Sequence, residues 1–406
     1  MRSVSEHQRV VSQLISARPA ANVGLADSLG LVLADDVIAP LSLPVFDNSA
    51  MDGYAVRAED VIGADPVNPV KLPVAEDIPA GRIDLLTLAP GTAHRIMTGA
   101  PMPSGATAVI AVESTDAGID TVTISASAKP GQHIRSAGGD VTIGSTVLHA
   151  GDTVTPAALG LVAALGLGEL AVIPRQRVLV ISTGSELVAA GTALQPGQIY
   201  ESNAVMLAAA VSDAGAEVVA ILTCDDDVAR FTALLDSHAG QTDLIITSGG
   251  VSAGAYEVVK DALDNSGVEG DSGVEFVKVA MQPGMPQGAG RTPGGSAIVT
   301  LPGNPVSALV SFEVFIRPAL RAAMNFPQPN RPHRTAVLAE DLSSPSGKRQ
   351  FRRGVYNPAD GTVVSYGPPA SHHLRWLASA NCLLDIAEDI TELAAGEQVE
   401  LWDLHP

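Results

Sequence analysis

The sequence has few cysteines, few basic residues and no long apolar run, and each shortage excludes a class of protein. It holds only two cysteines, Cys224 and Cys382, in 406 residues, so at most one disulfide can form and a reduced, cytoplasmic setting is expected. Lys and Arg number 24 against 44 Asp and Glu, a formal net charge of −20, which argues against nucleic acid or an anionic membrane as partner. No apolar run approaches ~18 residues and no signal-peptide core is recognisable, so a soluble protein is expected.

Common cofactor and metal motifs are also missing. The sequence contains no Walker loop, no G-x-G-x-x-G and no zinc-ligand spacing. His372 and His373 are adjacent, and neighbouring side chains on a strand point to opposite faces, so we do not expect them to share a metal. Cys224 has no base near it in sequence, which argues against a thiol nucleophile.

What is present indicates a multidomain globular protein. Hydrophobic residues make up 46% and charged residues 17%, enough to build buried cores. A chain of 406 residues exceeds one ordinary core, so two to four domains are expected. The 28 prolines and 39 glycines predict many turns and short strands.

The order of patterns along the chain predicts four domains. Residues 1–45 and 144–175 form one discontinuous domain, with short helices at 25–33 and through 144–173, and a β-rich domain at 46–143 is inserted into it. Residues 176–326 alternate strands and helices, which predicts a parallel, doubly wound α/β sheet. After a proline-rich linker, residues 327–406 form a small all-β domain.

The clearest candidate site lies in the α/β domain, where three predicted strands end in polar turns. The strand that begins at Leu244 breaks into Ser248-Gly249-Gly250, and paired glycines let the backbone turn tightly and approach a ligand. Strands before Ser182-Thr183-Gly184 and before Pro302-Gly303-Asn304-Pro305 end in similar turns. Parallel sheets bind ligands at the carboxyl ends of their strands, so we predict one shared anion-binding crevice there. The alternative for any one turn is an ordinary tight turn.

Charged residues near these turns are candidates for chemistry. Asp225, Asp226 and Asp227 follow another strand, where carboxylates could hold Mg²⁺ or cap the next helix. Glu186 follows the Thr-Gly turn of a neighbouring strand, which makes a shared carboxylate-metal site a reasonable prediction. Lys278 is a lone cation in an apolar strand. Because a buried lysine normally has a partner, a phosphate is one candidate.

Several long motifs resemble those of the MoeA family, the molybdopterin molybdenumtransferases, which are related to the E domain of gephyrin. The matching stretches are Pro44-x-Phe-Asp-Asn-Ser-Ala-Met-Asp-Gly-Tyr-Ala55, Met97-Thr-Gly-Ala-Pro101, Ser182-Thr-Gly, Ser248-Gly-Gly-Val-Ser252 and Leu301-Pro-Gly-Asn-Pro-Val-Ser307. The resemblance covers nearly the whole chain. It implies an elongated molecule with a MogA-like α/β domain, a dimerisation role for the discontinuous domain and a β-barrel-like C-terminal domain.

The resemblance also implies an activity: insertion of molybdate into adenylylated molybdopterin with release of AMP, with Mg²⁺, by a homodimer whose site lies between subunits. Its functional positions fall on Asp52, Thr98, Asp140, Glu186, Asp225, Lys278, Pro302, Pro305, Arg353 and Ser371. We expect Asp52, Glu186, Asp225 and Lys278 to act in catalysis, and Glu186, Asp225 and Glu257 to meet the metal. The substrate-binding set is Thr98, Asp140, Ser248, Gly249, Gly250, Ser252, Pro302, Gly303, Asn304, Pro305, Arg353 and Ser371.

The sequence departs from the family pattern at a few positions. Gln282 and Met285 stand where many members carry lysines, Glu257 stands for an aspartate, and Ser185 replaces an acidic residue. These changes bear on substrate affinity and metal geometry more than on the reaction class. Two alternatives stay open from sequence: the adenylyltransferase that makes the intermediate, and a gephyrin-like scaffold without catalysis.

Overall fold

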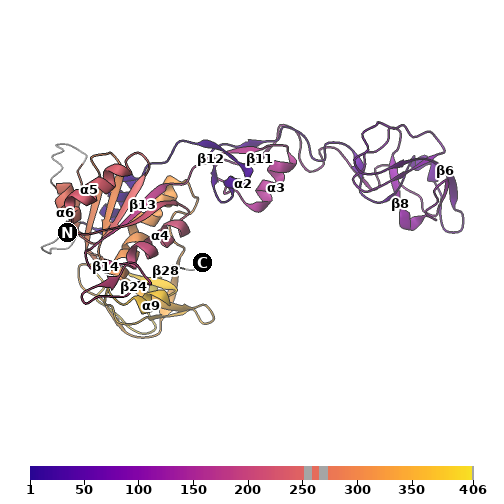
Figure 1. The fold of residues 1–406 in the computed structure, drawn as a ribbon. Helices are drawn as coiled ribbons and strands as arrows, with labels where there is room; N and C mark the ends of the chain where they lie inside the picture. The colour runs from indigo at the N-terminus through magenta and orange to yellow at the C-terminus, as the bar shows by residue number, and fades with distance from the viewer. Residues whose placement is uncertain (251–257, 265–272, 405–406) are drawn as a thin grey trace.

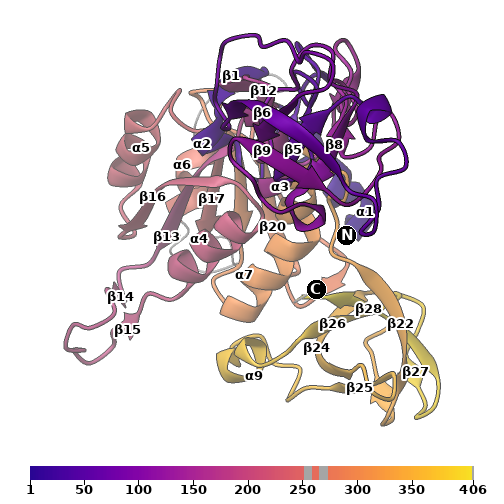
Figure 2. The ribbon, with the colours of Figure 1, turned by 90° about the vertical axis from the view of Figure 1, so that its right-hand side faces the viewer.

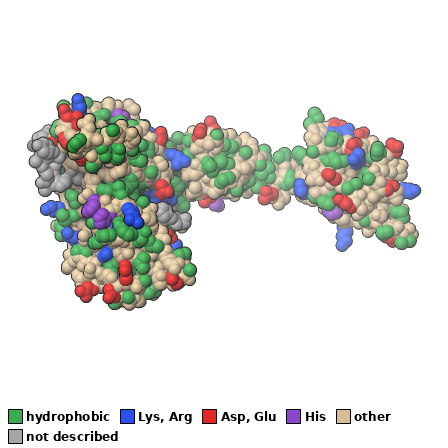
Figure 3. All heavy atoms as spheres, turned by 60° about the horizontal axis from the view of Figure 1, so that its bottom comes forward, with side chains coloured by type: hydrophobic (Ala, Val, Ile, Leu, Met, Phe, Trp, Pro, Cys, Tyr) green, Lys and Arg blue, Asp and Glu red, His purple; other side chains and the backbone are tan. Residues whose placement is uncertain are grey.

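The computed structural model describes residues 1–250, 258–264 and 273–404. The molecule is elongated, as predicted: an α/β body with a β-barrel beside it lies at one end and a β-rich lobe at the other (Figure 1). A small unit between them forms a narrow waist, also visible in the space-filling view (Figure 3).

The α/β body is built on a six-stranded sheet. Its strand order is β16 (Glu217–Cys224), β13 (Arg177–Thr183), β17 (Leu244–Ser248), β21 (Ala297–Leu301), β20 (Pro286–Arg291) and β18 (Glu275–Lys278). The first four strands are parallel, as expected. The expectation of an entirely parallel sheet is wrong at the other edge, where β20 pairs antiparallel with both β21 and β18. Only residues 292–296 join β20 to β21, too few for the crossover that a parallel pair needs.

Helices cover both faces of this sheet (Figure 2). They are α1 (Val4–Leu14), α4 (Asn203–Asp213), α5 (Val228–Ser237), α6 (Val258–Asp264) and the run α7 (Pro305–Ser311), η3 (Phe312–Ile316) and α8 (Arg317–Ala323). Along β13, Val178 and Val180 join the core on one face while Leu179 and Ile181 join the core on the other. Successive side chains point to opposite faces, and both faces are buried, so the strand is apolar throughout. Helix α1 packs into the first of these cores.

The C-terminal residues form a closed five-stranded barrel. Its strands run β24 (Arg349–Asn357), β25 (Thr362–Ser365), β22 (His333–Leu338), β28 (Gln398–Asp403) and β26 (Cys382–Ile386), which returns to β24. The smaller elements are α9 (Leu374–Ala378) and the pair β23 (Leu342–Ser343) and β27 (Glu392–Leu393). Strand β19 (Met281–Gln282) leaves the body to pair with β24, so body and barrel share backbone hydrogen bonds.

The waist joins two segments distant in sequence. Strands β1 (Ala21–Gly24), β12 (Glu169–Ile173) and β2 (Val32–Leu33) form one sheet, and β3 (Val37–Ile38) pairs with β11 (Thr146–Leu148). The predicted helix at 25–33 is wrong beyond α2 (Leu25–Ser28), because Gly30 takes a φ of +74° and the chain then enters β2. Within 144–173 only α3 (Pro156–Ala164) is helical, since the following β-branched and apolar residues pair as β12.

The lobe is β-rich, as predicted for residues 46–143. Its five-stranded sheet has the order β8 (Ala108–Ala111), β5 (Gly53–Val56), β7 (Ala93–Ile96), β6 (Val70–Ile78) and β9 (Thr121–Ile124). The pair β4 (Asn48–Ser49) and β10 (Ile134–Arg135) and the 3-10 helices η1 (Ala58–Val61) and η2 (Val112–Ser114) complete it. None of the described helices combines the length and the apolar character needed to cross a bilayer.

Candidate functional site

The three predicted strand-end turns meet at one edge of the body sheet. Ser182 and Ser248 are in register on the parallel strands β13 and β17. The Gly249 amide donates to the carbonyl oxygen of Leu301 at 3.2 Å, where β21 ends. The convergence expected from the sequence is therefore confirmed, because neighbouring parallel strands all end on the same side.

Gly249 has to be a glycine at this point. Its φ is +92°, and a β-carbon there would lie 2.7 Å from the carbonyl oxygen of Thr183. Glycine takes the left-handed conformation without steric cost. The turn after β17 can thus press against the turn after β13.

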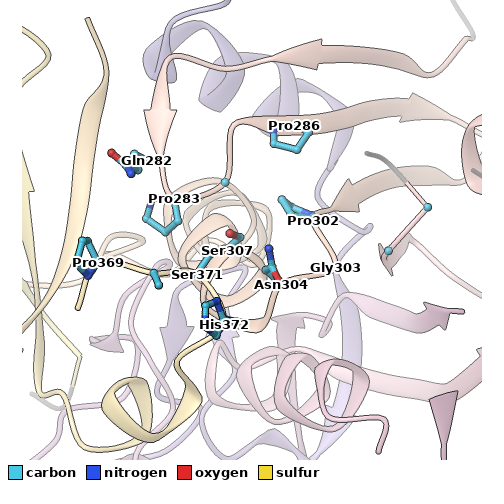
Figure 4. Close-up of a pocket in the computed structure, with 14 residues that line it drawn as sticks. Gln282, Pro283, Pro286, Pro302, Gly303, Asn304, Ser307, Pro369, Ser371 and His372 are labelled. Carbon is cyan, nitrogen blue, oxygen red and sulfur yellow. The ribbon is translucent and has the colours of Figure 1, made fainter. Parts of the chain in front are cut away.

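On one side of this turn lies a cavity of about 520 Å³, which we call the neutral pocket (Figure 4). It is lined by Gly249, Gly250, Gln282, Pro283, Gly284, Pro286, Pro302, Gly303, Asn304, Ser307, Pro369, Ala370, Ser371 and His372. None of these lining residues is an Asp, Glu, Lys or Arg. The pocket lies between the body and the barrel, and the loop with Ser371 and His372 faces Asn304 and Ser307 at the start of α7 (Figure 4).

Arg353 holds the barrel-side wall of the neutral pocket. Its side chain is buried, with 3% of the residue exposed, and it donates to the carbonyl oxygens of Ala370 at 3.3 Å, His373 at 3.2 Å and Pro368. The Ser371 carbonyl in turn accepts from the Val306 amide at 3.1 Å. The predicted substrate-binding residue Arg353 thus shapes the loop that carries Ser371, and Arg353 is not itself among the residues lining the pocket.

On the other side of the turn lies the acidic pocket, a cavity of about 360 Å³. It is lined by Thr183, Gly184, Glu186, Leu187, Ile199, Tyr200, Glu201, Ser202, Asn203, Asp226, Ser248, Gly249, Gly250, Gly303 and Pro305. The pockets share Gly249, Gly250 and Gly303, so they adjoin across the glycine turns. The acidic pocket's outer wall is the arm of β14 (Leu187–Val188) and β15 (Ile199–Tyr200), which extends from the body (Figure 2).

Asp225 lies toward a third cavity. Its Oδ2 pairs with the Arg230 guanidinium at 2.5 Å, and both residues line this cavity with Gly184 and Ser185. The next residue, Asp226, lines the acidic pocket and accepts hydrogen bonds from the Ser185 amide and hydroxyl at 3.2 and 2.8 Å. Asp227 caps α5, accepting from the Arg230 amide at 3.0 Å. Of the two roles predicted for the three aspartates, Asp227 takes helix capping, while Asp225 and Asp226 line cavities where a carboxylate could meet a metal.

The carboxylates suit a hard divalent cation. Glu186 and Asp226 both line the acidic pocket, and oxygen ligands are those that Mg²⁺ prefers. The described residues hold no group of three or more His, Cys, Asp or Glu placed to bind a metal. Mg²⁺ usually takes one or two carboxylates and completes its shell with water and substrate phosphate, so a pair of carboxylates fits.

Lys278 differs from the expectation. It ends the edge strand β18 and its side chain is exposed, so the argument from a costly buried cation is wrong. Its carbonyl oxygen accepts from the Arg2 amide at 2.9 Å. Gln282, which replaces a family lysine, does line the neutral pocket and accepts a hydrogen bond from Gln350 at 3.4 Å.

Asp52, Thr98 and Asp140 lie within residues 46–143, away from the strand-end pockets of the α/β body. The Thr98 amide and hydroxyl donate to Oδ1 of Asp52 at 2.6 and 2.7 Å. These bonds, the backbone one first, lower the pKa of Asp52. Asp140 is exposed and its amide donates to the carbonyl of Leu43 at 2.9 Å. Asp52 and Thr98 flank β5 and β7 of the lobe, which Figure 1 shows well separated from the body of the same chain.

Two predicted residues, Ser252 and Glu257, lie outside the described residues. Sequence reasoning missed Glu201 and Asn203, and it did not favour Asp226 over Asp225. Glu201 carried one usable signal: an acidic residue two positions before the start of α4, where a carboxylate can cap the helix.

Comparison with known proteins matches the whole chain. Models of the MoeA N-terminal region (domains I and II), a probable molybdopterin binding domain and the MoeA C-terminal region (domain IV) match residues 2–166, 179–322 and 335–404. Molybdopterin molybdenumtransferase 2 of Mycobacterium tuberculosis is 70% identical over 405 residues, covering 100% of both chains. Molybdopterin molybdenumtransferase of Haemophilus influenzae is 35% identical over 97% of this chain and 96% of its own.

Solved structures agree. A MoeA protein from Pyrococcus horikoshii, 29% identical, superimposes with a TM-score of 0.81 over 100% of this chain and 99% of its own. A second MoeA structure from the same organism has a TM-score of 0.74 at 28% identity, over 99% of this chain and 100% of its own. Motifs, fold and full-length relatives coincide, and the chain belongs to the MoeA family.

Proposed function

We propose that this protein inserts molybdate into adenylylated molybdopterin and releases AMP, the step that completes the molybdenum cofactor. The observation that supports it most is the pair of adjoining pockets built from the turns after β13, β17 and β21. One pocket is uncharged and suited to an oxyanion. The other carries carboxylates. A substrate with a phosphoanhydride and a heterocycle needs both kinds of surface at once.

The neutral pocket would receive molybdate beside the pterin side chain. The backbone amide of Gly250, the Ser371 hydroxyl and the Asn304 side-chain amide offer donors without a fixed positive charge. Oxyanion exchange at the metal would then depend on positioning, with no protein nucleophile. Arg353 would act by holding the Ser371 loop in place.

Glu186 and Asp226 would hold Mg²⁺ in the acidic pocket, with Asp225 on the adjoining wall. When bound, the ion supplies Lewis-acid polarisation of the phosphoanhydride. Ser185 orients Asp226 through two hydrogen bonds. The paired Arg230 keeps a cation beside Asp225, where the leaving phosphate would depart.

We further propose a homodimer in the cytoplasm. Asp52 and Thr98 form a pre-ordered polar turn far from the body of their own chain. A lobe contributed by a second subunit would bring such a turn to the strand-end pockets. Both cysteines are free and buried, which suits a reducing compartment.

The alternatives account for less of the chain. An adenylyltransferase needs only the α/β unit, whereas the lobe, waist and barrel here occupy most of the remaining sequence. A scaffold has no need for the Glu186–Asp226 wall or the Asp52–Thr98 turn.

The test is AMP release by anaerobically purified protein supplied with adenylylated molybdopterin, Mg²⁺ and molybdate. We expect release that depends on molybdate and yields active cofactor for an apo-molybdoenzyme. Release that is equally fast without molybdate would overturn the proposal, and consumption of ATP with free molybdopterin would favour the adenylyltransferase.

A further inference from the structure

The buried polar atoms of the acidic pocket have a fixed hydrogen-bond polarity. Ser182 and Ser248 are 1% and 2% exposed, and their hydroxyl oxygens lie 3.0 Å apart. The Ser182 hydroxyl also lies 2.7 Å from Oε1 of Glu201. An ionised carboxylate only accepts, so the single Ser182 proton points at Glu201.

This arrangement fixes the direction of the hydrogen bond between Ser182 and Ser248. With its own proton committed, Ser182 can only accept from Ser248, and Ser248 therefore donates to Ser182. Ser248 lines the acidic pocket, and within the described part of the chain its oxygen receives no hydrogen bond. It consequently presents lone pairs, not a proton, to whatever occupies the pocket.

Asn203 presents the same polarity. Its amide nitrogen donates to the carbonyl oxygen of Gly303 at 2.7 Å, which fixes the oxygen on the other side. That oxygen, Oδ1, is buried and has no partner among the described residues. A buried acceptor without a donor costs stability, so it indicates a donor that arrives with a ligand.

Glu201 connects these elements. Its residue is 9% exposed, and Oε1 accepts from both the Ser182 hydroxyl and the Ala204 amide at 2.7 Å. It thereby joins the ends of β13 and β17 to the first turn of α4. No lysine or arginine lines the acidic pocket within the described ranges, so no cationic side chain of the pocket stands beside these acceptors.

We propose that this wall binds the N–H-bearing edge of an amino-substituted nitrogen heterocycle, and that Glu201 is the positioning residue that makes Ser248 an acceptor. The inference rests on the proposed function, whose substrate carries two such rings, a pterin and an adenine. The Ser248 hydroxyl therefore does not serve as a phosphate donor. Anion binding belongs to the glycine backbone and the neutral pocket.

The experiment measures affinity for two matched pairs of probes by titration calorimetry with the full-length protein. Pterin is compared with lumazine, and AMP with IMP; the second member of each pair has an oxo group in place of the amino group. We expect one amino-bearing ring to bind about 10-fold or more tightly than its oxo partner, since the oxo group turns an acceptor toward the acceptors of the wall where the amino group offers donors. The pair that shows the preference identifies the ring.

Variants distinguish an effect on hydrogen-bond direction from a general loss of pocket structure. Ser248→Ala should reduce the preference below about 3-fold. Glu201→Gln can offer an amide donor to Ser182, so the Ser182 proton is no longer committed and Ser248 is no longer forced to donate to Ser182. This variant should reduce the preference similarly. A purely structural loss would weaken both members of a pair equally. Glu217→Gln, an exposed acid at the amino end of β16, is the control and should keep the wild-type ratio.

Equal affinity for amino and oxo members in both pairs would overturn the inference, as would an unchanged preference in Ser248→Ala. Molybdate-dependent AMP release by the wild-type protein is measured in parallel. If release occurs without a ring preference, the pocket assignment fails and the function stands. If the preference is present without such release, the pocket assignment stands and the transferase does not.

Discussion

Gly249 and Gly303 approach each other closely: a β-carbon at Gly303 would lie 3.5 Å from the α-carbon of Gly249, at van der Waals distance. The two glycines lie in the turns after β17 and β21, and both line the neutral and the acidic pocket. Because glycine has no side chain, only backbone separates the two pockets at these residues. A substrate can lie across it and reach both chemistries.

Replacing Gly303 by alanine should thicken this partition. The added methyl group meets Gly249 at ordinary van der Waals distance, and Gly303 has no left-handed φ, so the free energy of unfolding should change by less than about 1 kcal/mol. The KM for adenylylated molybdopterin should rise about 10-fold. The matched control is Gly160→Ala, where a β-carbon meets nothing within 4 Å in α3. An unchanged KM for Gly303→Ala would show that the substrate does not cross this wall.

Removing the guanidinium of Arg353 should loosen the Ser371 loop. Arg353→Met leaves the carbonyl oxygens of Pro368, Ala370 and His373 without their donor, which should cost about 2–3 kcal/mol in urea unfolding. The KM for molybdate should rise, and Arg353→Lys should restore part of the loss. Arg352→Met, which removes a bond to Ser343, should leave that KM unchanged. A normal molybdate KM in Arg353→Met would contradict the loop-positioning role.

The aspartates after β16 should have separable effects. Asp225→Asn should reduce AMP release at least about 100-fold, the range typical of a lost group at a reacting centre. Asp226→Asn should raise the Mg²⁺ concentration needed for half-maximal activity, because Asp226 lines the same pocket as Glu186. Titration of Mg²⁺ at saturating substrate distinguishes the two. Turnover unaffected by Asp225→Asn would remove that residue from the mechanism.

His7 should make stability depend on pH. It is fully buried against Phe315, with ring centroids 4.7 Å apart, and this burial, followed by the nearby Arg2, lowers its pKa from 6.5 to about 4. Because the folded state binds the proton less well than the unfolded state, the free energy of unfolding should be constant above pH 6.5 and fall between about 6.5 and 4.

His7→Leu should remove this part of the slope, on the order of 3 kcal/mol over the whole window. Urea unfolding at pH 7 and pH 4.5 measures it, and the exposed His149→Gln serves as control. Identical slopes for the wild type and His7→Leu would show that His7 is not the group responsible.

The position of the site was predictable from sequence for a local reason. Runs of β-branched residues that end in Ser, Gly or Pro, as at Ile246 to Gly250, predict both a strand and the turn that follows it. The all-β character of the C-terminal domain and the β-rich lobe followed from the same short-range signals, whereas the barrel was expected from the resemblance to the MoeA family. The hairpin of β20 and β21 was missed because the turn at 292–296 reverses the chain where a crossover was expected.

The remaining site residues depend on tertiary placement. Glu201 and Asn203 reach the pocket because the β14–β15 arm returns to the sheet edge, and no local pattern encodes that return. Asp225 and Asp226 are adjacent in sequence but point toward different cavities, a choice set by Ser185 and Arg230. Lys278 is exposed because β18 is an edge strand, which an apolar run alone does not reveal.

The most direct test of the account is AMP release from adenylylated molybdopterin, followed with and without molybdate at fixed Mg²⁺ under anaerobic conditions. The account predicts release that rises with molybdate to saturation, with one AMP formed for each molybdenum inserted. Release that is independent of molybdate, or its absence while the protein is folded and supplied with Mg²⁺, would contradict it.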